Sequence, residues 1–443
     1  MYTVGLYTLG CKVSLYETEA IAEAFEQAGF RRCPFEDVCD VYVINTCTVT
    51  AESDAKSRKY IRRAVRSNPN AAVIVIGCYG QRAPEEVAGI EGVSAVLGTA
   101  NKMQSVQLAL ELLSATKPQG ADPEDRSLNL VTPLDGTPFE PMRITRAPRT
   151  RAYVKIEDGC ECRCTYCAIS AARGPVRSKS PEDVISEVEE LYAGGTREVV
   201  LTGIETGSYG ADLGEGYGLA DLLCELDSRH SCERVRLGSM APELIGEKFI
   251  SRVAGLPILA PHFHVSMQSG SSRVLRGMKR RYSREMALEN LDRIRRLIPH
   301  VTFTADLMVG FPGESEEDFE DTLSFVREVR LLDAHVFAYS RRAGTPAADY
   351  PDQIPDGVKQ ERSRRLIMEK NRIRDEVLGE IVASGRPLPT VLETEQDGYL
   401  TGHSDTYAEV RIPAGRAERG ELVSVLPIRH EGGIIYGDIA EKQ

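Results

Sequence analysis

Two regions of this chain alternate short apolar runs with amphipathic stretches. In residues 1 to about 100, the runs TVGLYTL, VCDVYVIN and AAVIVIG are rich in β-branched residues and have the length of strands. A helical pattern from Tyr16 to Ala28 lies between the first two runs and ends before Gly29. Strands that alternate with helices predict a small parallel sheet with helices packed on it.

The second alternation begins at Ala152 and contains six strand candidates. They are AYVKIE, EVVLTG, RVRLGS, HFHVSM, VTFTADLMVG and AHVFAYS. Between them, Ser180 before Pro181 and Ser315 before Glu316 are typical of capped helix starts, because acidic residues follow each serine. Six βα units predict an open, partial (β/α)6 barrel, short of the eight units that close the common form.

The remaining segments follow neither pattern. Residues 115–150 are rich in Pro, Gly and Asp and predict a linker. Residues 356–380 predict a long basic helix, and beyond Ser384 short strand runs with turn signals predict a small OB-like barrel of five strands. The sequence therefore predicts an α/β chain with domains at 1–114 and 151–380, a linker at 115–150, and an all-β domain at 381–443.

Composition limits the class of protein. The chain has 443 residues, of which 42% are hydrophobic and 27% charged, as in ordinary globular domains. No apolar run approaches the roughly 20 residues that span a bilayer, and the start MYTVGLYTLG reads as a strand rather than a signal peptide. Eleven cysteines without an export signal indicate reduced thiols or metal ligands. We therefore expect a cytoplasmic protein.

The charge distribution leaves two interpretations open. A net charge of −12 disfavours binding to phosphate backbones, but basic residues gather in three stretches. These stretches either form a path for nucleic-acid phosphates or are solvated helix faces balanced by nearby acids. Their members are Lys56, Arg58, Lys59, Arg62, Arg63 and Arg66; Arg273, Arg276, Lys279, Arg280 and Arg281; and Lys359, Arg362, Arg364, Arg365, Lys370, Arg372 and Arg374.

The strongest chemical signal is a tight triad of cysteines. Cys160, Cys164 and Cys167 have C-x3-C-x2-C spacing, directly after a strand whose end would lie at the mouth of the barrel. Thiolates are soft ligands for iron–sulfur clusters or zinc. A structural zinc needs a fourth ligand, and the adjacent Cys162 would strain a tetrahedral site. The triad favours an iron–sulfur cluster with one open iron over zinc or unliganded thiols.

A second triad is spread along the first region. Cys11, Cys47 and Cys78 each come just after one of the predicted parallel strands. Because the carboxyl ends of such strands lie at one edge of the sheet, the fold can bring the three thiols together. Scattered buried cysteines are common, and that alternative stays open for the triad alone. Strand-end placement favours a second cluster.

The motifs resemble known families. C-x3-C-x2-C followed by a βα barrel resembles the radical S-adenosylmethionine superfamily. The segments TLGCKVSLYETE, INTCTVT and IGCYGQR, together with LTGIETGSYG, HVSMQSGSSRVLRGMKRRY and DLMVGFPGESEEDF, narrow the resemblance to methylthiotransferases, and the terminal barrel resembles their TRAM domain. GCKV with LYETE, and LTGIETGSYG, are most similar to the branch that acts on N6-threonylcarbamoyladenosine in tRNA.

This resemblance implies an activity and its cofactors. It implies methylthiolation of C2 of that adenosine beside the anticodon, with two [4Fe-4S] clusters and S-adenosylmethionine as both radical source and methyl donor. The C2–H bond is inert to ordinary acid–base chemistry, so a carbon radical is a plausible route. The implied partners are the anticodon loop of tRNA and an electron donor such as a flavodoxin or ferredoxin, for a monomer away from membranes.

Three alternatives remain. Sister branches of the family act on N6-isopentenyladenosine in tRNA or on a ribosomal-protein aspartate. A non-catalytic, zinc-containing RNA-binding protein represents a different class.

The resemblance also implies side chains that contact S-adenosylmethionine. These are Tyr166, Gly203, Glu205, Ser266, Gln268, Gly310, Gly313 and Glu314. The alternative for Tyr166 is a packing aromatic, and for the others ordinary turn chemistry. No catalytic side chain is expected beyond the cluster ligands Cys11, Cys47, Cys78, Cys160, Cys164 and Cys167.

The sequence departs from the family pattern in several places. Ser14 stands where an asparagine is usual, and Cys162 is an extra thiol beside the tight triad. The terminal barrel is acidic, with ten Asp and Glu against six Lys and Arg from Ser384 onward. Cys33, Cys39, Cys224 and Cys232 match no motif, and we expect buried or free thiols there.

Overall fold

The chain forms two compact units, each built from separate stretches of sequence. The computed structural model describes residues 1–114, 127–147, 149–214 and 216–440, so 115–126 of the predicted linker lie outside the described residues. The first unit comprises Met1–Ile144, Glu157–Lys179 and Ser340–Thr345. The second comprises Thr145–Ile156, Ser180–Tyr339 and Pro346–Gln443. The units cut across the domain ranges expected from sequence, and those ranges stay a prediction.

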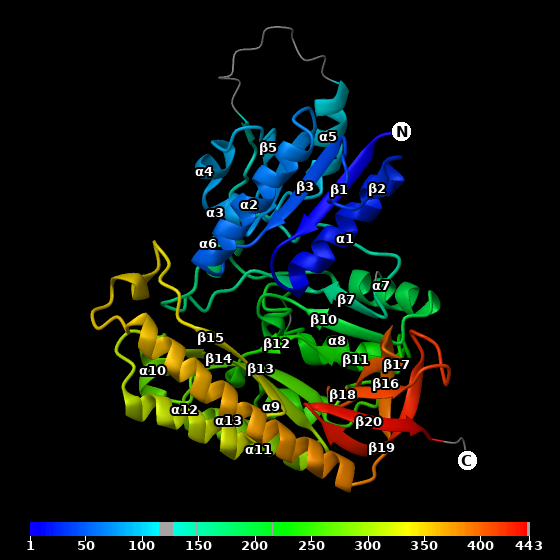
Figure 1. The fold of residues 1–443 in the computed structure, drawn as a ribbon, viewed down its shortest axis with the longest axis vertical. Helices are drawn as coiled ribbons and strands as arrows, with labels where there is room; N and C mark the ends of the chain where they lie inside the picture. Colours follow the sequence, from blue (N-terminus) through cyan, green and yellow to red (C-terminus); the bar gives the residue numbers. More distant parts are fainter. Residues whose placement is uncertain (115–126, 148, 215, 441–443) are drawn as a thin grey trace. The chain divides into compact units, whose positions relative to one another are not determined.

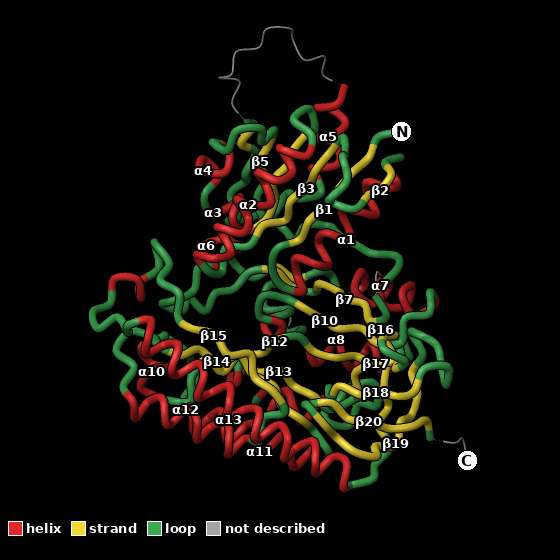
Figure 2. Tube along the Cα trace, viewed as in Figure 1, coloured by secondary structure: helices red, strands yellow, loops and turns green. Residues whose placement is uncertain are grey.

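The first unit contains the predicted parallel sheet. Six parallel strands lie in the order β2-β1-β3-β4-β5-β6. Of these, β2, β1, β3 and β5 are labelled in Figures 1 and 2. The strands are β1 (Thr3–Thr8), β2 (Arg31–Cys33), β3 (Val41–Thr46), β4 (Ala72–Gly77), β5 (Ala95–Val96) and β6 (Leu128–Asn129). The helices are α1 (Lys12–Gln27), α2 (Ala51–Ser67), α3 (Cys78–Arg82), α4 (Pro84–Ala88), α5 (Gln104–Ser114) and α6 (Ile169–Arg173). A short antiparallel pair, β8 (Glu157–Asp158) and β9 (Arg177–Ser178), completes it.

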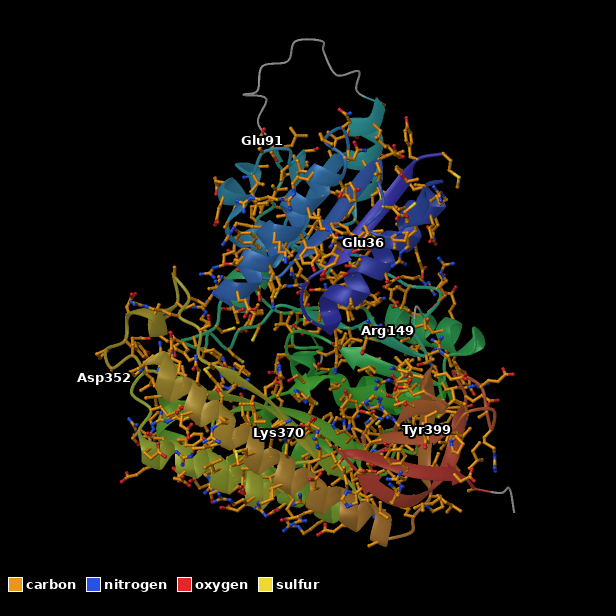
Figure 3. All side chains as sticks on the ribbon, viewed as in Figure 1. Glu36, Glu91, Arg149, Asp352, Lys370 and Tyr399 are labelled. Atoms are coloured by element: carbon orange, nitrogen blue, oxygen red, sulfur yellow. The ribbon has the colours of Figure 1, made fainter. Side chains whose placement is uncertain are left out.

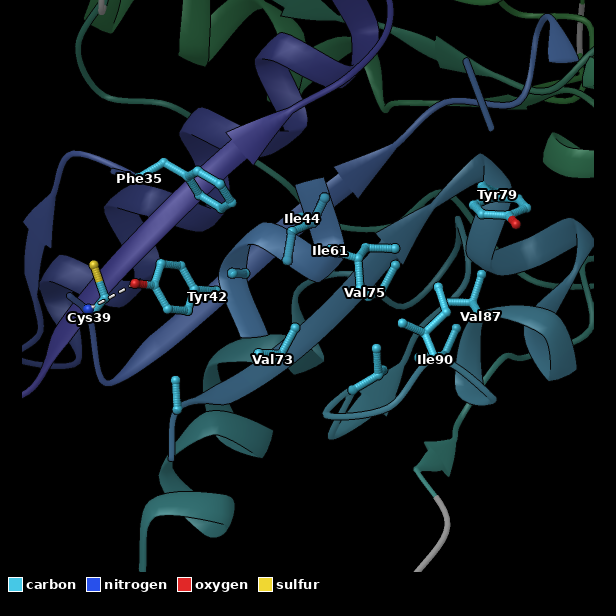
Figure 4. Close-up of a cluster of buried hydrophobic side chains, with 14 of the residues drawn as sticks. Phe35, Cys39, Tyr42, Ile44, Ile61, Val73, Val75, Tyr79, Val87 and Ile90 are labelled. Carbon is cyan, nitrogen blue, oxygen red and sulfur yellow. Dashed lines mark hydrogen bonds between the residues drawn. The ribbon is translucent and has the colours of Figure 1, made fainter. Parts of the chain in front are cut away.

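The core of this sheet explains its uninterrupted apolar strands. Every residue of β3 and β4 is buried, as expected for a parallel sheet covered on both faces. Tyr42, Ile44, Val73 and Val75 pack with Ile61 of α2 (Figure 4). The same cluster encloses two of the cysteines without a motif, Cys33 and Cys39, and burial raises the pKa of Cys39 to about 11. These thiols are packing residues.

The second unit contains the partial barrel. Its strands form two parallel sheets, β11-β10-β7 and β12-β13-β14-β15, joined by a bridge between Val235 and Leu259. They are β7 (Arg151–Lys155), β10 (Glu198–Thr202), β11 (Arg234–Leu237), β12 (Ser239–Met240), β13 (His262–Gln268), β14 (Thr302–Val309) and β15 (Asp333–Ala338). The six predicted strands are present; β12 was not predicted. It follows Gly238, where a Cβ would lie 3.0 Å from the Leu201 carbonyl.

Helices follow the strands of this unit. They are α7 (Pro181–Ala193), α8 (Leu219–Ser228), α9 (Glu247–Val253), α10 (Ser272–Gly277), α11 (Arg284–Leu297), α12 (Glu316–Val329) and α13 (Asp356–Ala383), with 3-10 turns at Thr206–Ser208, Pro242–Ile245 and Pro346–Asp349. The predicted helix starts are confirmed, because Ser180 accepts the Asp183 N–H and Ser315 the Asp318 N–H. No helix in the described part of the chain is long and apolar enough to cross a membrane.

The basic residues of α13 are neutralised within the unit. Lys370, labelled in Figure 3, pairs with Asp333, and Arg365 pairs with Glu316 and Glu320. The other cations of the stretch are also paired: Lys359, Arg362, Arg364, Arg372 and Arg374. For this stretch the interpretation as a charge-balanced helix face is correct.

The C-terminal segment closes the predicted five-stranded barrel, in the order β16-β17-β18-β20-β19. Its strands are β16 (Leu388–Gln396), β17 (Tyr399–Ser404), β18 (Glu409–Pro413), β19 (Leu422–Glu431) and β20 (Ile434–Ile439).

A buried carboxylate fixes this barrel to the sheet of β7, β10 and β11. Glu198 on β10 contacts Arg234 and Arg236 at 2.5 and 2.8 Å and Arg151 at 3.5 Å. Arg234 and Arg236 also donate to backbone carbonyls of the barrel, at Pro389 and Asp405. The barrel is therefore held by buried ionic contacts rather than by a loose tether.

Candidate metal centre

Each cysteine of the wide triad lies where a strand of the first unit ends. Cys11 caps α1 just beyond β1, Cys47 directly follows β3, and Cys78 begins α3 directly after β4. Because β1, β3 and β4 are neighbours in the sheet, all three residues lie at one edge, as the strand-end argument predicts. Cys11 is exposed, Cys47 half-buried and Cys78 buried.

Two of the three thiols have pKa values that depend on other thiols of the triad. Burial raises the pKa of Cys78 to about 11, and the neighbouring Cys47 and Cys11 add to this rise while Arg173 opposes it. Burial also raises the pKa of Cys47, with a further contribution from Cys11. Gly10, directly before Cys11, adopts φ +135°, and a Cβ there would lie 2.9 Å from the Ser14 hydroxyl. The structure thus brings the three sulfurs into one neighbourhood.

The tight triad lies on a loop that is closed at its base. The Cys160 N–H donates to the Gly174 carbonyl at 3.0 Å, where β8 and β9 pair. Gly159 adopts φ +99°, and any Cβ there would collide with the Pro175 carbonyl. Within the loop, backbone N–H groups point at two sulfurs: Cys162 N–H at Cys160 Sγ (3.5 Å) and Ile169 N–H at Cys167 Sγ (3.3 Å). Such N–H···S bonds are typical of sulfurs that bind iron–sulfur clusters.

Both triads belong to the first compact unit. The segment Glu157–Lys179 carries Cys160, Cys164 and Cys167 and is part of the same unit as the strands that precede Cys11, Cys47 and Cys78. Thr99 Oγ1 donates to the Ala172 carbonyl at 2.7 Å, which fixes α6 within that unit.

A buried arginine from the segment that carries the tight triad contacts the wide triad. Arg173, at the end of α6, donates from Nε to Cys78 Sγ at 3.2 Å and from Nη1 to both Asp158 oxygens at 3.2 Å. It also forms a bidentate contact with Glu17 of α1. Burial alone would lower the pKa of Arg173, but Asp158, Cys78 and Glu17 raise it well above its usual value.

The surrounding ionic network is buried and paired. Lys102 Nζ lies 3.3 Å from both Glu17 and Glu140, and Arg177 lies 3.5 Å from Asp158. Buried charges are retained in proteins only when such partners are present. Sequence reasoning missed this network, because no local pattern shows that Glu17, Lys102 and Arg173 meet.

The thiol sets suit a cluster better than a single ion. Among the residues that the structure describes, no group of three or more His, Cys, Asp or Glu side chains is arranged to hold one metal ion. In a four-iron cluster each thiolate binds a different iron, so the sulfurs stand further apart. Two sets of three soft donors are the ligand sets that two four-iron clusters with one open iron each would take.

The predicted S-adenosylmethionine contacts lie in both units. Tyr166 is half-buried in the first unit, between Cys164 and Cys167. The other predicted contacts, Gly203, Glu205, Ser266, Gln268, Gly310, Gly313 and Glu314, belong to the second unit at or near the ends of β10, β13 and β14.

Of these predicted contact residues, Gln268 has the clearest features of a ligand-binding residue. It ends β13 with φ +66°, where the pairing with β14 shifts register. Its Oε1 is buried and accepts no hydrogen bond. A strained backbone with an orphaned buried acceptor is typical of a ligand-binding position. This geometry is compatible with the predicted contact to S-adenosylmethionine, which stays a prediction.

Other predicted contacts are engaged within the protein. Both carboxylate oxygens of Glu314 accept the Gly310 N–H at 3.1 Å, and Arg362 donates to one of them at 2.8 Å. Burial raises the pKa of Glu314 despite these contacts. Glu205 accepts the Ala241 N–H at 2.9 Å, and the Ser266 hydroxyl lies 3.1 Å from that of Ser239. For these residues a structural role is visible.

Comparison with known proteins decides the family. A model of the Radical SAM superfamily matches residues 154–326, and one described as uncharacterized protein family UPF0004 matches residues 3–98. The chain is 39% identical over 429 residues to "Threonylcarbamoyladenosine tRNA methylthiotransferase MtaB" of Bacillus subtilis strain 168, covering 96% of this chain and 93% of that protein. The chain belongs to the tRNA methylthiotransferase family.

Family relatives include a second named group. "tRNA-2-methylthio-N(6)-dimethylallyladenosine synthase" of Thermoanaerobacter pseudethanolicus is 32% identical, covering 98% of this chain and 92% of that protein. Among solved structures, the radical S-adenosylmethionine methyltransferase TsrM from Kitasatospora setae matches with a TM-score of 0.58 and 17% identity, over 78% and 77% of the two chains. That likeness supports the fold alone.

Family membership confirms several predictions. The enzyme class is a radical S-adenosylmethionine methylthiotransferase, and its cofactors are S-adenosylmethionine and [4Fe-4S] clusters. The residues that hold these cofactors stay a prediction.

Proposed function

We propose that this enzyme transfers a methylthio group to C2 of N6-threonylcarbamoyladenosine beside the anticodon of tRNA. One observation carries the proposal: three relatives named for this nucleoside are 34–39% identical and align with nearly the whole chain. Relatives named for dimethylallyladenosine are 32–35% identical, and they make that nucleoside the second candidate.

Two sets of three thiols would hold the cofactors. Cys160, Cys164 and Cys167 would bind the radical-generating cluster, and Cys11, Cys47 and Cys78 the auxiliary cluster, each leaving one iron open. When bound, the clusters and S-adenosylmethionine supply the carbon radical, the sulfur and the methyl group that replace an inert C–H bond. The chain's own contribution is to hold these groups and to orient Gln268 toward a ligand.

The substrate has an accessible base. Anticodon loops present unstacked nucleotides that proteins can turn out and read. We further propose the predicted functional division, with the auxiliary cluster in 1–114, radical chemistry in 151–380 and the TRAM barrel in 381–443. A flavodoxin or ferredoxin as electron donor, a monomeric state and a cytoplasmic location complete the proposal.

Three substrates offered to one preparation test the proposed function. Anaerobically reconstituted enzyme is incubated with tRNA carrying threonylcarbamoyladenosine, tRNA carrying dimethylallyladenosine, and a ribosomal protein with a target aspartate. We expect mass spectrometry of the digests to find the methylthio product on the first substrate at least tenfold faster than on the others. A preference for either of the other two substrates would contradict the proposal.

Helix α2 presents an exposed basic surface that suits phosphates. Lys59, Arg62 and Arg66 are exposed on one face at helical spacing, and within the described residues no carboxylate lies close enough to pair with them. The other three cations of this stretch are paired: Lys56 with Glu52, Arg58 with Glu86, and Arg63 with Glu36. Unlike α13, this face keeps free positive charge for a backbone of phosphates.

Replacing these three α2 residues with alanine tests this surface. Each lost phosphate contact reduces the salt dependence of log K by about 0.9 on duplex nucleic acid. We expect tRNA affinity to fall at least tenfold at low salt and the slope of log K against log[salt] to flatten by about two to three. The matched control is Arg364→Ala with Arg372→Ala on α13, whose cations pair with Glu361, Glu369 and Glu376. Equal losses in both variants would contradict the assignment.

A further inference from the structure

Arg173 makes a contact that the expected chemistry leaves unexplained. Its side chain is completely buried, and its Nε–H points at Cys78 Sγ from 3.2 Å. The remaining donors engage the Glu17 and Asp158 carboxylates. A guanidinium held on three sides has little freedom to turn away from the sulfur.

The backbone on both sides of Arg173 is also fixed. The Ala172 carbonyl accepts from Thr99, and the Gly174 carbonyl accepts from the Cys160 N–H. The Arg173 carbonyl accepts from Arg177 at 2.8 Å. Since α6 begins two residues after Cys167, the segment that carries the tight triad also delivers the guanidinium to Cys78.

We propose that Arg173 is a positioning residue that sets the reduction potential of the auxiliary cluster through its hydrogen bond to the Cys78 thiolate. This inference rests on the proposed function, because it requires a cluster on Cys11, Cys47 and Cys78. Hydrogen bonds to cluster sulfurs and nearby charge are established determinants of cluster potential. A fixed cation stabilises the reduced state, which carries one more negative charge, so Arg173 raises the potential.

The local dielectric makes the effect large. Burial excludes water from the Arg173–Cys78 contact, and Coulomb interactions are strong in such surroundings. Glu17 acts in the opposite sense, because its negative charge is held against the same guanidinium. Without the guanidinium, the Glu17 and Asp158 carboxylates would lose the cation that they share and keep their ion pairs with Lys102 and Arg177, respectively.

The test uses enzyme in which Cys160, Cys164 and Cys167 are alanine, so that only the auxiliary cluster forms. Arg173→Gln and Arg173→Lys are made in this background, and the cluster is titrated with reductant under EPR detection. We expect the equilibrium constant for one-electron reduction to fall at least tenfold in the Gln variant, equivalent to about 59 mV, and by less in the Lys variant. The matched control is Lys102→Gln, which removes a buried cation from Glu17 without a sulfur contact.

Several results would overturn the inference. The inference is wrong if Arg173→Gln keeps both its iron and the reduction potential of the parent. It is also wrong if Lys102→Gln shifts the reduction potential as much as Arg173→Gln does. If Arg173→Gln binds no iron, Arg173→Lys provides the test. A reduction potential below that of the parent supports the role of Arg173, and an unchanged potential refutes it. A parent triple variant without iron would instead refute the auxiliary cluster itself, and the inference with it.

A second measurement keeps Arg173 in place, so its result does not depend on whether an Arg173 variant folds. Protein of the same triple-alanine background, grown with 15N-labelled arginine, is reduced and studied by electron spin echo envelope modulation. A nitrogen 3.2 Å from a ligand sulfur should give a 15N coupling on the auxiliary cluster signal. Absence of that coupling would show that the hydrogen bond does not exist in the loaded protein.

Discussion

Replacing Cys11, Cys47 and Cys78 together with alanine is expected to abolish methylthiolation while S-adenosylmethionine cleavage continues. The three thiols share one sheet edge, and Cys11 and Cys47 both contribute to the raised pKa of Cys78, so we expect them to act as one site. Iron per chain should fall from about eight to about four, because each cluster holds four. The measurements are iron content, 5′-deoxyadenosine yield, and mass spectrometry of the tRNA nucleosides.

Cys39→Ala is the matched control for this variant. Cys39 lies in the same unit and is buried, but it packs in the apolar core and belongs to neither triad (Figure 4). It should retain the full iron content and product yield. A triple variant that still forms the methylthio product would refute the auxiliary site.

Replacing Glu198 with alanine is expected to lower the free energy of unfolding of the second unit by about 3 kcal/mol or more. The change leaves Arg151, Arg234 and Arg236 buried without their shared carboxylate, and two of these arginines also hold the terminal barrel. Urea unfolding at pH 7 measures the loss. Glu233→Ala is the control, because the Glu233–Arg197 pair is substantially exposed and should contribute at most about 1 kcal/mol.

The ion pairs of Glu198 also predict how the stability of the protein depends on pH in acid. Burial raises the pKa of this carboxyl, but the arginines, Arg236 foremost, outweigh burial and hold the pKa far below its usual 4.5. A carboxyl with a lowered folded pKa stabilises the protein above the unfolded pKa, and this contribution is lost as pH falls toward the folded value. Wild-type stability should therefore decline below about pH 4.5 more steeply than that of Glu198→Gln. Parallel declines of the two proteins would contradict this assignment.

Much of the fold follows from local pattern. The runs around Val43, Val75 and Val200 are mostly apolar because their strands are covered on both faces, and that pattern can be recognised in the sequence. Strand ends place Cys11, Cys47 and Cys78 at one edge without any knowledge of side-chain contacts. Serine caps at Ser180 and Ser315 mark helix starts by chemistry that acts over three residues.

The rest depends on contacts between remote residues. Nothing near Arg173 in the sequence shows that its partners are Glu17 and Cys78, far earlier in the chain. The cations of α13 look available until α12 and β15 supply Glu316 and Asp333. The assignment of 157–179 to the first unit is equally non-local, because Thr99 and Glu17, far earlier in the chain, contact Ala172 and Arg173 of that segment.

The central claim is that two separate clusters occupy two cysteine triads. The most direct measurement is a crystal structure of the anaerobically reconstituted enzyme, with anomalous scattering recorded at the iron edge. The account predicts two separate iron peaks, one bounded by Cys160, Cys164 and Cys167 and the other by Cys11, Cys47 and Cys78. A single peak at the tight triad, with ordered but unliganded thiols at Cys11, Cys47 and Cys78, would contradict it.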